Sequence, residues 1–151
     1  MMTFKSIYAQ EFQCKFEEVY SDSEVQSGFF LFKKQKFRYQ YNDKNLFTIF
    51  LLGNEFFLSK NSNRDIYQNI TEKNIIITEL KKIIADYPQL KSEYVTNSLK
   101  INLEYSKSFD FLKRISFSSK ELSLSIFFYE CSKKQIPDRF FILNPFYEYK
   151  L

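Results

Sequence analysis

Apolar and polar residues alternate along most of this chain, which is the pattern of strands with one face in the core and the other in water. From Phe37 to Tyr41 every second residue is aromatic and the residues between are polar. The same alternation recurs over residues 100–105 and 122–128. We therefore predict a series of short antiparallel strands.

Polar breaks separate these strands. NDKN at 42–45 and GN at 53–54 predict turns, SKNSNRD at 59–65 predicts a loop, and SSKE at 118–121 predicts the turn of a hairpin. The segment 46–52, LFTIFLL, is apolar on both faces. A short strand is expected in IYQNI after the loop.

The period changes to that of a helix in only one long window. Between Asn74 and Tyr87 apolar residues recur at helical spacing, Asn74 is placed to cap the start, and Pro88 ends the segment. The apolar stripe of this predicted lid helix comprises Ile76, Leu80, Ile83 and Ile84. We also predict a short N-terminal helix running into a strand at 12–16, and a last strand at 138–143.

Many evenly spaced strands with one or two helices predict an α+β, mainly β fold. We expect a strongly curved antiparallel sheet that forms an incomplete, half-open β-barrel covered by helices. At 151 residues the chain has the length of a single domain, 1–151. A monomer is expected.

Composition raises the question of what the interior holds. The chain has 19 Phe and 11 Tyr, and the stretch 27–41, SGFFLFKKQKFRYQY, adds four basic residues to its aromatics without an acid. Such a stretch fits either a polyanion-binding surface or a hairpin whose apolar face lines a cavity. The net charge of +4 is only mildly basic, so nucleic-acid binding is not expected.

Candidate chemistry is sparse. The chain has no histidine and two cysteines, so we expect no enzyme activity, no metal site and no cofactor. Cys14 and Cys131 are compatible with a disulfide or with two buried free thiols. No apolar stretch reaches the roughly 18 residues of a membrane-spanning helix, and the first residues lack the apolar core of a signal peptide. A cytoplasmic protein or a mature exported one is expected.

The order of motifs resembles that of the periplasmic outer-membrane lipoprotein carrier family (LolA-like). The matching features, in chain order, are Phe12 and Gln13, Gly28, Lys33 and Lys34, Phe37-Arg38-Tyr39, Gly53 followed by Phe56-Phe57, the helix after Asn74, and DRFFILNP at 138–145. The resemblance covers nearly the whole chain. It departs from the family where the basic residues at 33 and 34 lack a following proline.

The resemblance implies a half-open barrel that shields the acyl chains of a lipoprotein moving from the inner to the outer membrane. It further implies a periplasmic location, a lipid or acylated lipoprotein as cargo, and an inner-membrane release complex and outer-membrane receptor as partners. By this resemblance Lys33 or Lys34 would latch the lid helix shut. The alternative is that both lysines have no latch role and are solvated on a strand edge.

The alternation phase selects candidates for the lining of the cavity. They are Phe30, Phe37, Tyr39, Tyr41, Ile49, Leu51, Phe57, Leu103, Leu124 and Ile126. As ordinary core residues they would instead fill the interior. Three other functions stay open: a binder of another lipid, an envelope sensor or interaction domain with a filled core, and a polyanion-binding module.

Overall fold

The strands of the protein form one ten-stranded sheet in which every paired neighbour is antiparallel. The computed structural model describes residues 11–34, 36–53, 55–63, 67–70, 79, 82–83, 85–86, 89–96, 98–105 and 112–142. The strands are β1 (Glu11–Tyr20), β2 (Val25–Lys33), β3 (Lys36–Tyr41), β4 (Phe47–Leu52), β5 (Glu55–Lys60), β6 (Tyr67–Ile70), β7 (Glu93–Val95), β8 (Lys100–Tyr105), β9 (Leu112–Ser118) and β10 (Ser123–Lys133). A 3-10 helix, η1, spans Asp138–Phe141.

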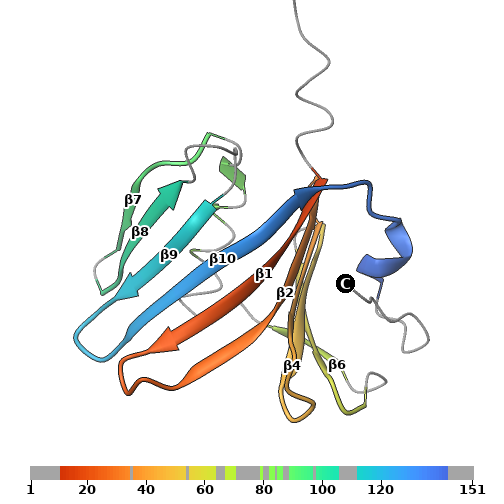
Figure 1. Ribbon diagram of the computed structural model, residues 1–151, viewed down its shortest axis with the longest axis horizontal. Coiled ribbons are helices and arrows are strands. Elements are labelled where there is room, and N and C mark those ends of the chain that lie inside the picture. The colour runs from red at the N-terminus through yellow and green to blue at the C-terminus, as the bar shows by residue number, and fades with distance from the viewer. Residues whose placement is uncertain are drawn as a thin grey trace, which may run out of the picture.

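The strand order is β6-β5-β4-β3-β2-β1-β10-β9-β8-β7. Strands β1 to β6 form a meander, as predicted over β3 to β6, and β9 and β10 form the predicted hairpin, whose turn is closed between Ser119 and Leu122. The pairing of β1 with β10 joins the two halves of the chain in the middle of the sheet (Figure 1). Local alternation does not indicate this long-range pairing.

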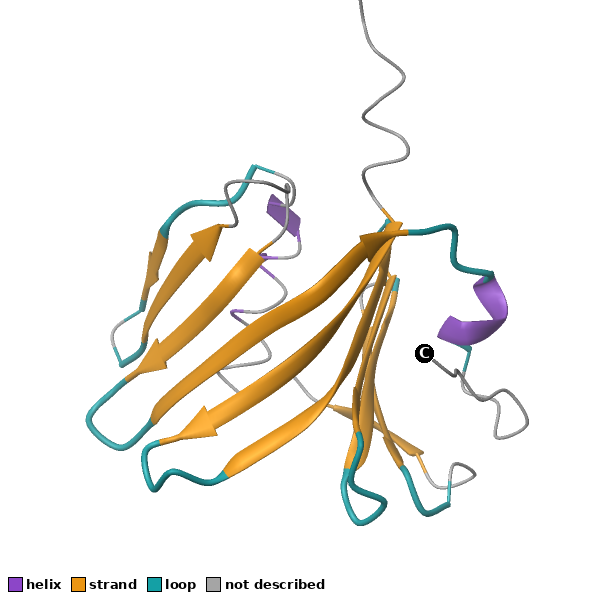
Figure 2. Ribbon diagram, in the orientation of Figure 1, coloured by secondary structure: helices purple, strands orange, loops and turns teal. Residues whose placement is uncertain are grey.

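The expected α+β class, with helices covering a half-open barrel, is wrong. The structure is almost entirely antiparallel sheet, and the sheet is not closed, since β6 and β7 stand at its two ends (Figure 2). All five described positions within the predicted lid helix, at 79, 82–83 and 85–86, have helical backbone, and the rest of that window lies outside the described residues. The helical period occupied one window of the sequence, whereas the period of two extends through the rest and dominates the fold.

The predictions for the chain ends had different outcomes. The strand at 12–16 is confirmed as part of β1, and the N-terminal helix lies outside the described residues. The strand predicted at 138–143 is wrong, because residues Asp138–Phe141 form η1 directly after Pro137. Pro137 has no N–H for a ladder, and the segment gains more by packing Phe141 against the sheet.

Each face of the sheet carries its own apolar cluster. The inner face is defined by Phe12, Cys14 and Phe16 of β1 and by the residues paired with them, and it holds the main core. The outer face carries a second cluster built from Phe29, Leu31, Ile136 and Phe141. Strand β2, which contributes Phe29 and Leu31 to the outer cluster, is therefore apolar on both sides.

Residues 134–142, here called the C-terminal strap, cover the outer face of β2 and β3. The Arg38 side chain donates to the carbonyl oxygen of Phe140 at 3.1 Å, and Lys33 Nζ donates to that of Ile136 at 2.8 Å. Lys33 also pairs with the carboxylate of Asp138 at 3.1 Å. The hydrogen bond and charge of Lys33 hold the pKa of Asp138 below its usual value. These contacts fix the strap against the sheet.

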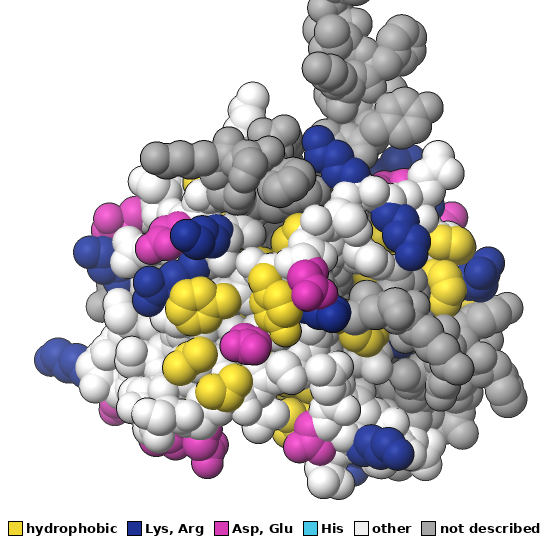
Figure 3. All heavy atoms as spheres, in the orientation of Figure 1, with side chains coloured by type: hydrophobic (Ala, Val, Ile, Leu, Met, Phe, Trp, Pro, Cys, Tyr) yellow, Lys and Arg dark blue, Asp and Glu magenta, His cyan; other side chains and the backbone are white. Residues whose placement is uncertain are grey.

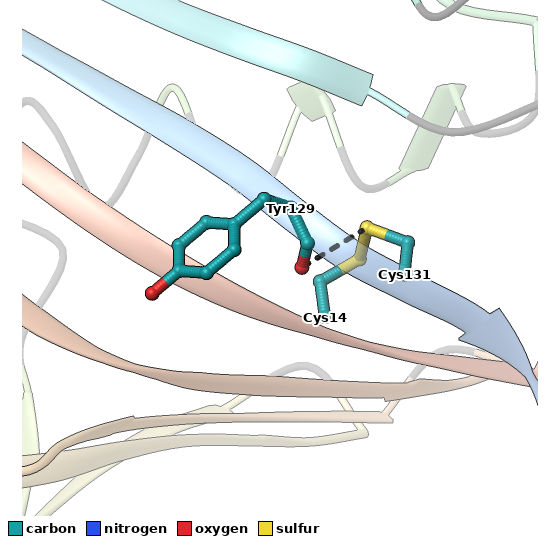
Figure 4. The surroundings of a disulfide bond; sticks show 3 residues. All are labelled: Cys14, Tyr129 and Cys131. Carbon is teal, nitrogen blue, oxygen red and sulfur yellow. Dashed lines mark hydrogen bonds between the residues drawn. A yellow bond between two sulfur atoms is a disulfide. The ribbon is translucent and has the colours of Figure 1, made fainter.

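Cys14 of β1 and Cys131 of β10 form a disulfide (Figure 4). Of the two alternatives left open by the sequence, a disulfide or two free thiols, the structure has the disulfide. Glu130 has a φ of 48°, and the β1–β10 register shifts between Gln13 and Lys15. Such a bulge adds one residue to a strand and so reverses the side on which later side chains point. The bulge thereby places Cys131 opposite Cys14.

Candidate functional site

The inner face holds an apolar pocket at the end of the sheet where β1 begins and β2 ends. It is lined by Phe12, Cys14, Phe30, Phe32, Ile83, Leu90, Leu112 and Phe128. These side chains come from β1, β2, β9 and β10, from the helical residue Ile83 and from the segment before β7. The cavity volume is about 50 Å³. No charged side chain is among the lining residues, so the pocket suits hydrocarbon.

Aromatic rings fill most of the space next to this pocket. Phe30 lies at their centre, with ring centroids between 5.3 and 6.4 Å from those of five neighbours. The neighbours are Phe12, Phe32, Phe37, Tyr39 and Phe128. Phe30 and Phe128 are only partly buried. Rings in tilted contact of this kind can repack without breaking hydrogen bonds.

The structure places all but one of the predicted lining residues on the inner face. Register and the core cluster assign there Phe30, Phe37, Tyr39, Tyr41, Ile49, Leu51, Leu103, Leu124 and Ile126. Of these, only Phe30 contributes to the apolar pocket itself. Phe57 is wrongly assigned, because it pairs with Phe50 on the outer face, and Phe56 takes the inner position.

Six lining residues were not predicted to line a cavity. Phe12, Cys14, Phe32, Leu112 and Phe128 lie near strand ends or beside the bulge, and Leu90 lies in the segment before β7. The alternation of β1 carried a signal for Phe12 and Cys14, which are in phase with Phe16. The remaining members depend on strand order, which the sequence pattern leaves undefined.

A buried carboxyl group lies deeper on the inner face. The side chain of Glu18 on β1 accepts hydrogen bonds from the hydroxyls of Tyr20 at 2.7 Å, Tyr41 at 2.8 Å and Tyr39. Glu18 is 3% exposed, and Phe16 stacks on Tyr39 with ring centroids 3.9 Å apart. Because every buried carboxyl oxygen here accepts at least one bond, the group is satisfied. It fixes the tyrosines of β3 against β1.

The sequence analysis missed Glu18 as a functional or structural group. A signal was present, because Glu18 is in phase with Phe12, Cys14 and Phe16 on the apolar side of its strand. An acid in that phase is either exposed at a strand end or buried with partners. The tyrosines at 39 and 41 supply those partners.

The tyrosine hydroxyls around Glu18 lead us to expect loss of stability at alkaline pH. Burial, reinforced by the Glu18 carboxyl group, raises the pKa of Tyr39 and of Tyr41 above the ordinary value of 10.0. The native state therefore keeps protons that the unfolded state loses above about pH 10, and the free energy of unfolding falls there by up to about 1.4 kcal/mol per pH unit for each tyrosine.

Urea unfolding measured between neutral pH and pH 11 checks this expectation. Stability should stay level with respect to these groups below about pH 10 and decline above it. In Tyr41→Phe the decline should be shallower, since one of the coupled hydroxyls is gone. An identical alkaline slope in the wild type and in Tyr41→Phe would count against the assignment.

The predicted lid residues are only partly described. Ile83 is buried and lines the pocket, whereas Ile76, Leu80 and Ile84 lie outside the described residues. Glu79 and Lys82 form an ion pair at 3.0 Å beside Ile83. Among the described residues of this segment, Ile83 is the one that lines the pocket.

The lysines assigned to a latch lie at the end of the sheet next to the pocket. Lys33 Nζ contacts the C-terminal strap and pairs with Glu11 at 3.2 Å. Lys34 is exposed in the turn after β2, with a φ of 52°. These contacts of Lys33 hold the strap against the sheet. That Lys33 or Lys34 holds the helical segment closed stays a prediction.

The polyanion-binding alternative required Lys33, Lys34, Lys36 and Arg38 to form one exposed patch. Arg38 is 2% exposed, and its guanidinium lies 5.6 Å from the ring centroids of both Phe29 and Phe50. The strap covers it. The four basic residues therefore do not form one exposed patch.

Comparison with known proteins leaves the family undecided. No protein-family model matches this chain, and no curated protein matches it in sequence. In the described part of the chain, no helix is long and apolar enough to cross a membrane. Likewise, no group of three or more potential metal-binding side chains lies together among the residues that the structure describes.

Proposed function

We propose that this protein is a carrier that holds acyl chains against the inner face of its open sheet. As the resemblance to the LolA-like family implies, the cargo would be an acylated lipoprotein crossing the periplasm to the outer membrane. The observation that carries the proposal is the pocket formed by Phe12, Phe30, Phe32, Phe128 and their apolar neighbours. The disulfide supports it, since disulfides persist in oxidising compartments such as the periplasm.

The pocket must enlarge to take a chain. Its volume of about 50 Å³ is well below that of a ~150 Å³ apolar cavity that admits benzene. The partly buried rings of Phe30 and Phe128 are the movable wall, and they would swing aside as a chain enters. Their displacement offsets part of the gain from burial, at about 0.8 kcal/mol for each methylene. A carrier needs such a cost because it must also release its cargo.

The same small volume favours a second candidate function. A solidly packed inner face would suit an interaction domain that binds proteins and takes no lipid. This candidate predicts that acyl chains neither bind nor displace the rings. Direct titration with an acyl ligand separates the two functions.

Two adjacent phenylalanines supply a matched pair for that titration. Phe128 lines the pocket, whereas Phe127 lies on the outer face, 36% exposed, with the guanidinium of Arg114 5.1 Å from its ring. We expect Phe128→Glu to weaken binding of a fluorescent fatty acid by roughly tenfold or more, because its charge must be desolvated beside the chain. Phe127→Glu should leave binding within about twofold of the wild type.

The urea unfolding midpoint of each variant shows whether that variant is folded. Should Phe128→Glu unfold, Leu112→Trp fills the same pocket without adding charge and should also block the fatty acid. Equal effects of the changes at 127 and 128, or undiminished binding in Leu112→Trp, would place the acyl site elsewhere. Absence of binding by the wild type would favour the interaction domain.

A further inference from the structure

Apolar side chains are exposed on the outer face of the sheet, beside the region that the C-terminal strap covers. Phe127 and Tyr129 of β10 are 36% and 39% exposed, and Val25 of β2 is 53% exposed. Val19 of β1 is the register partner of Val25. These four residues are here called the outer patch. Figure 3 shows yellow hydrophobic side chains gathered over β1 and β10 on this face, and exposed apolar groups of this kind mark interaction sites.

Two opposite charges flank the outer patch symmetrically. Phe127 is the register partner of Glu17 on β1 and also of Arg114 on β9. The side chains of paired residues point to the same face, and neighbouring strands lie about 4.8 Å apart. Glu17 and Arg114 therefore stand on either side of Phe127, each one strand away from β10.

Neither of these charges has a hydrogen-bonded counter-ion among the described residues. Glu17 is exposed, and no hydrogen bond or ion pair joins its carboxylate to any part of the chain that the structure describes. The Arg114 guanidinium donates to the hydroxyl of Ser125 at 2.9 Å and lies 3.6 Å from Glu104, too far for a hydrogen bond. Within the same described residues, its Nε has no acceptor. Arg114 therefore retains donors for a carboxylate, and Glu17 is a carboxylate without a donor.

This arrangement is complementary to a second copy of itself. A two-fold axis that runs along β10, between two outer faces laid against each other, brings Phe127 of one copy onto Phe127 of the other. The same axis exchanges the positions of β1 and β9, so Glu17 of each copy faces Arg114 of the other, and each contact is made twice. Sheets packed face to face in this way keep their strands nearly aligned, as they do in β-sandwiches.

We propose that the protein forms a symmetric dimer through the outer patch, held by Phe127 and by two Glu17–Arg114 pairs between the copies. Aromatic and arginine side chains at the centre of an interface supply most of its binding energy, and arginine binds a carboxylate with two parallel hydrogen bonds. The dimer replaces the monomer that the sequence led us to expect. The proposal is independent of the acyl-binding function, because the apolar pocket lies on the inner face.

Charge exchange between two variants tests the proposed contact. Glu17→Arg sets arginine against arginine in a dimer, and Arg114→Glu sets glutamate against glutamate. Each variant alone should therefore be monomeric at concentrations where the wild type is a dimer. An equimolar mixture of the two variants should form a heterodimer, because every arginine then faces a glutamate. Sedimentation equilibrium measures the masses of the wild type, the separate variants and the mixture.

Two further variants test the apolar contact and supply the control. Phe127→Glu should weaken self-association by roughly thirtyfold or more, as loss of a central aromatic side chain does. Glu55→Arg changes the charge as much as Glu17→Arg does, but its site is exposed at the start of β5 and it should leave the dimer unchanged. Urea unfolding midpoints show that each variant is folded.

A wild type that stays monomeric throughout the concentration series would overturn the proposal and leave the outer patch to a different protein. A mixture of the two charge variants that does not associate would also overturn it, as would a dimer that Phe127→Glu leaves intact. Fatty-acid titration separates these results from the proposed function. Folded, monomeric Phe127→Glu should still bind the fatty acid, whereas absence of binding by a dimeric wild type would count against the acyl carrier alone.

Discussion

Removing the disulfide is expected to lower the free energy of unfolding by about 4–5 kcal/mol. The cross-link joins residues separated by 117 positions, so it strongly reduces the conformational entropy of the unfolded chain. In the chain-entropy treatment, closing a loop of about 100 residues contributes ~4.7 kcal/mol to stability. A domain of this size has a total stability of about 5–15 kcal/mol. The reduced protein should therefore approach its unfolding threshold.

Urea unfolding of two forms measures this effect. The wild type in reductant and the double variant Cys14→Ala, Cys131→Ala should lose stability to a similar extent if the cross-link is the source. The variant alone also loses the packing of the buried Cys14 side chain. A loss below about 1 kcal/mol in both forms would contradict the stabilising role of the β1–β10 bridge.

Alanine at position 28 is expected to cost roughly 3–5 kcal/mol. A Cβ on Gly28 would lie 1.9 Å from the carbonyl oxygen of Gln40 and 2.6 Å from the ring of Phe16. The oxygen belongs to the neighbouring strand and cannot move alone, and the Phe16 ring is held by its stack on Tyr39. The change should therefore separate β2 from β3 or expel the ring.

Gly53→Ala is the matched control for that measurement. No atom lies within 4 Å of a Cβ built at Gly53, whose φ of 65° is the source of strain in this case. That backbone strain costs roughly 1–2 kcal/mol. A Gly28→Ala penalty no larger than that of Gly53→Ala would show that the inner face tolerates expansion beside Phe16.

Local patterns predicted the faces of the strands well where one face is apolar and the other is polar. In β3 the alternation placed Phe37, Tyr39 and Tyr41 on the inner face, and the register agrees. In β8 and β10 the same argument placed Leu103 and Ile126 correctly. The period of two is informative because a shift by one residue would expose every apolar side chain.

The pattern failed where the outer face is also buried. The C-terminal strap packs Ile136 and Phe141 against Phe29 and Leu31, so β2 is apolar on both faces. In β5 the adjacent Phe56 and Phe57 give the alternation no phase, and the prediction of Phe57 in place of Phe56 is wrong. Arg38, in phase with the polar residues of β3, is buried beneath the strap and not in water.

The pairing of strands that lie far apart in the chain could not be predicted from the sequence. The pairing of β1 with β10 brings Cys14 to Cys131 and completes the pocket with Phe128, yet no local feature indicates it. Loop-closing contacts of this kind depend on the energy of the whole fold, which one sequence does not display. The bulge at Glu130 adds a further change of phase.

The aromatic and basic stretch at 27–41 now divides into three parts. Its inner aromatics, among them Phe30 and Phe37, pack in the core beside the pocket. Arg38 and Lys33 bind the carbonyl groups of the strap on the other face. Lys34 lies in the turn after β2, and Lys36 begins β3 with its Nζ 3.7 Å from the carboxylate of Asp138.

Release of a lipoprotein from spheroplasts tests the proposed carrier most directly. The purified protein is incubated with spheroplasts that carry a newly made acylated lipoprotein, and a non-acylated version serves as the control. We predict that the acylated form enters the soluble fraction as a one-to-one complex, that the control forms no complex, and that Phe128→Glu abolishes loading while Phe127→Glu does not. No release by the folded wild type, or release independent of acylation, would contradict the account.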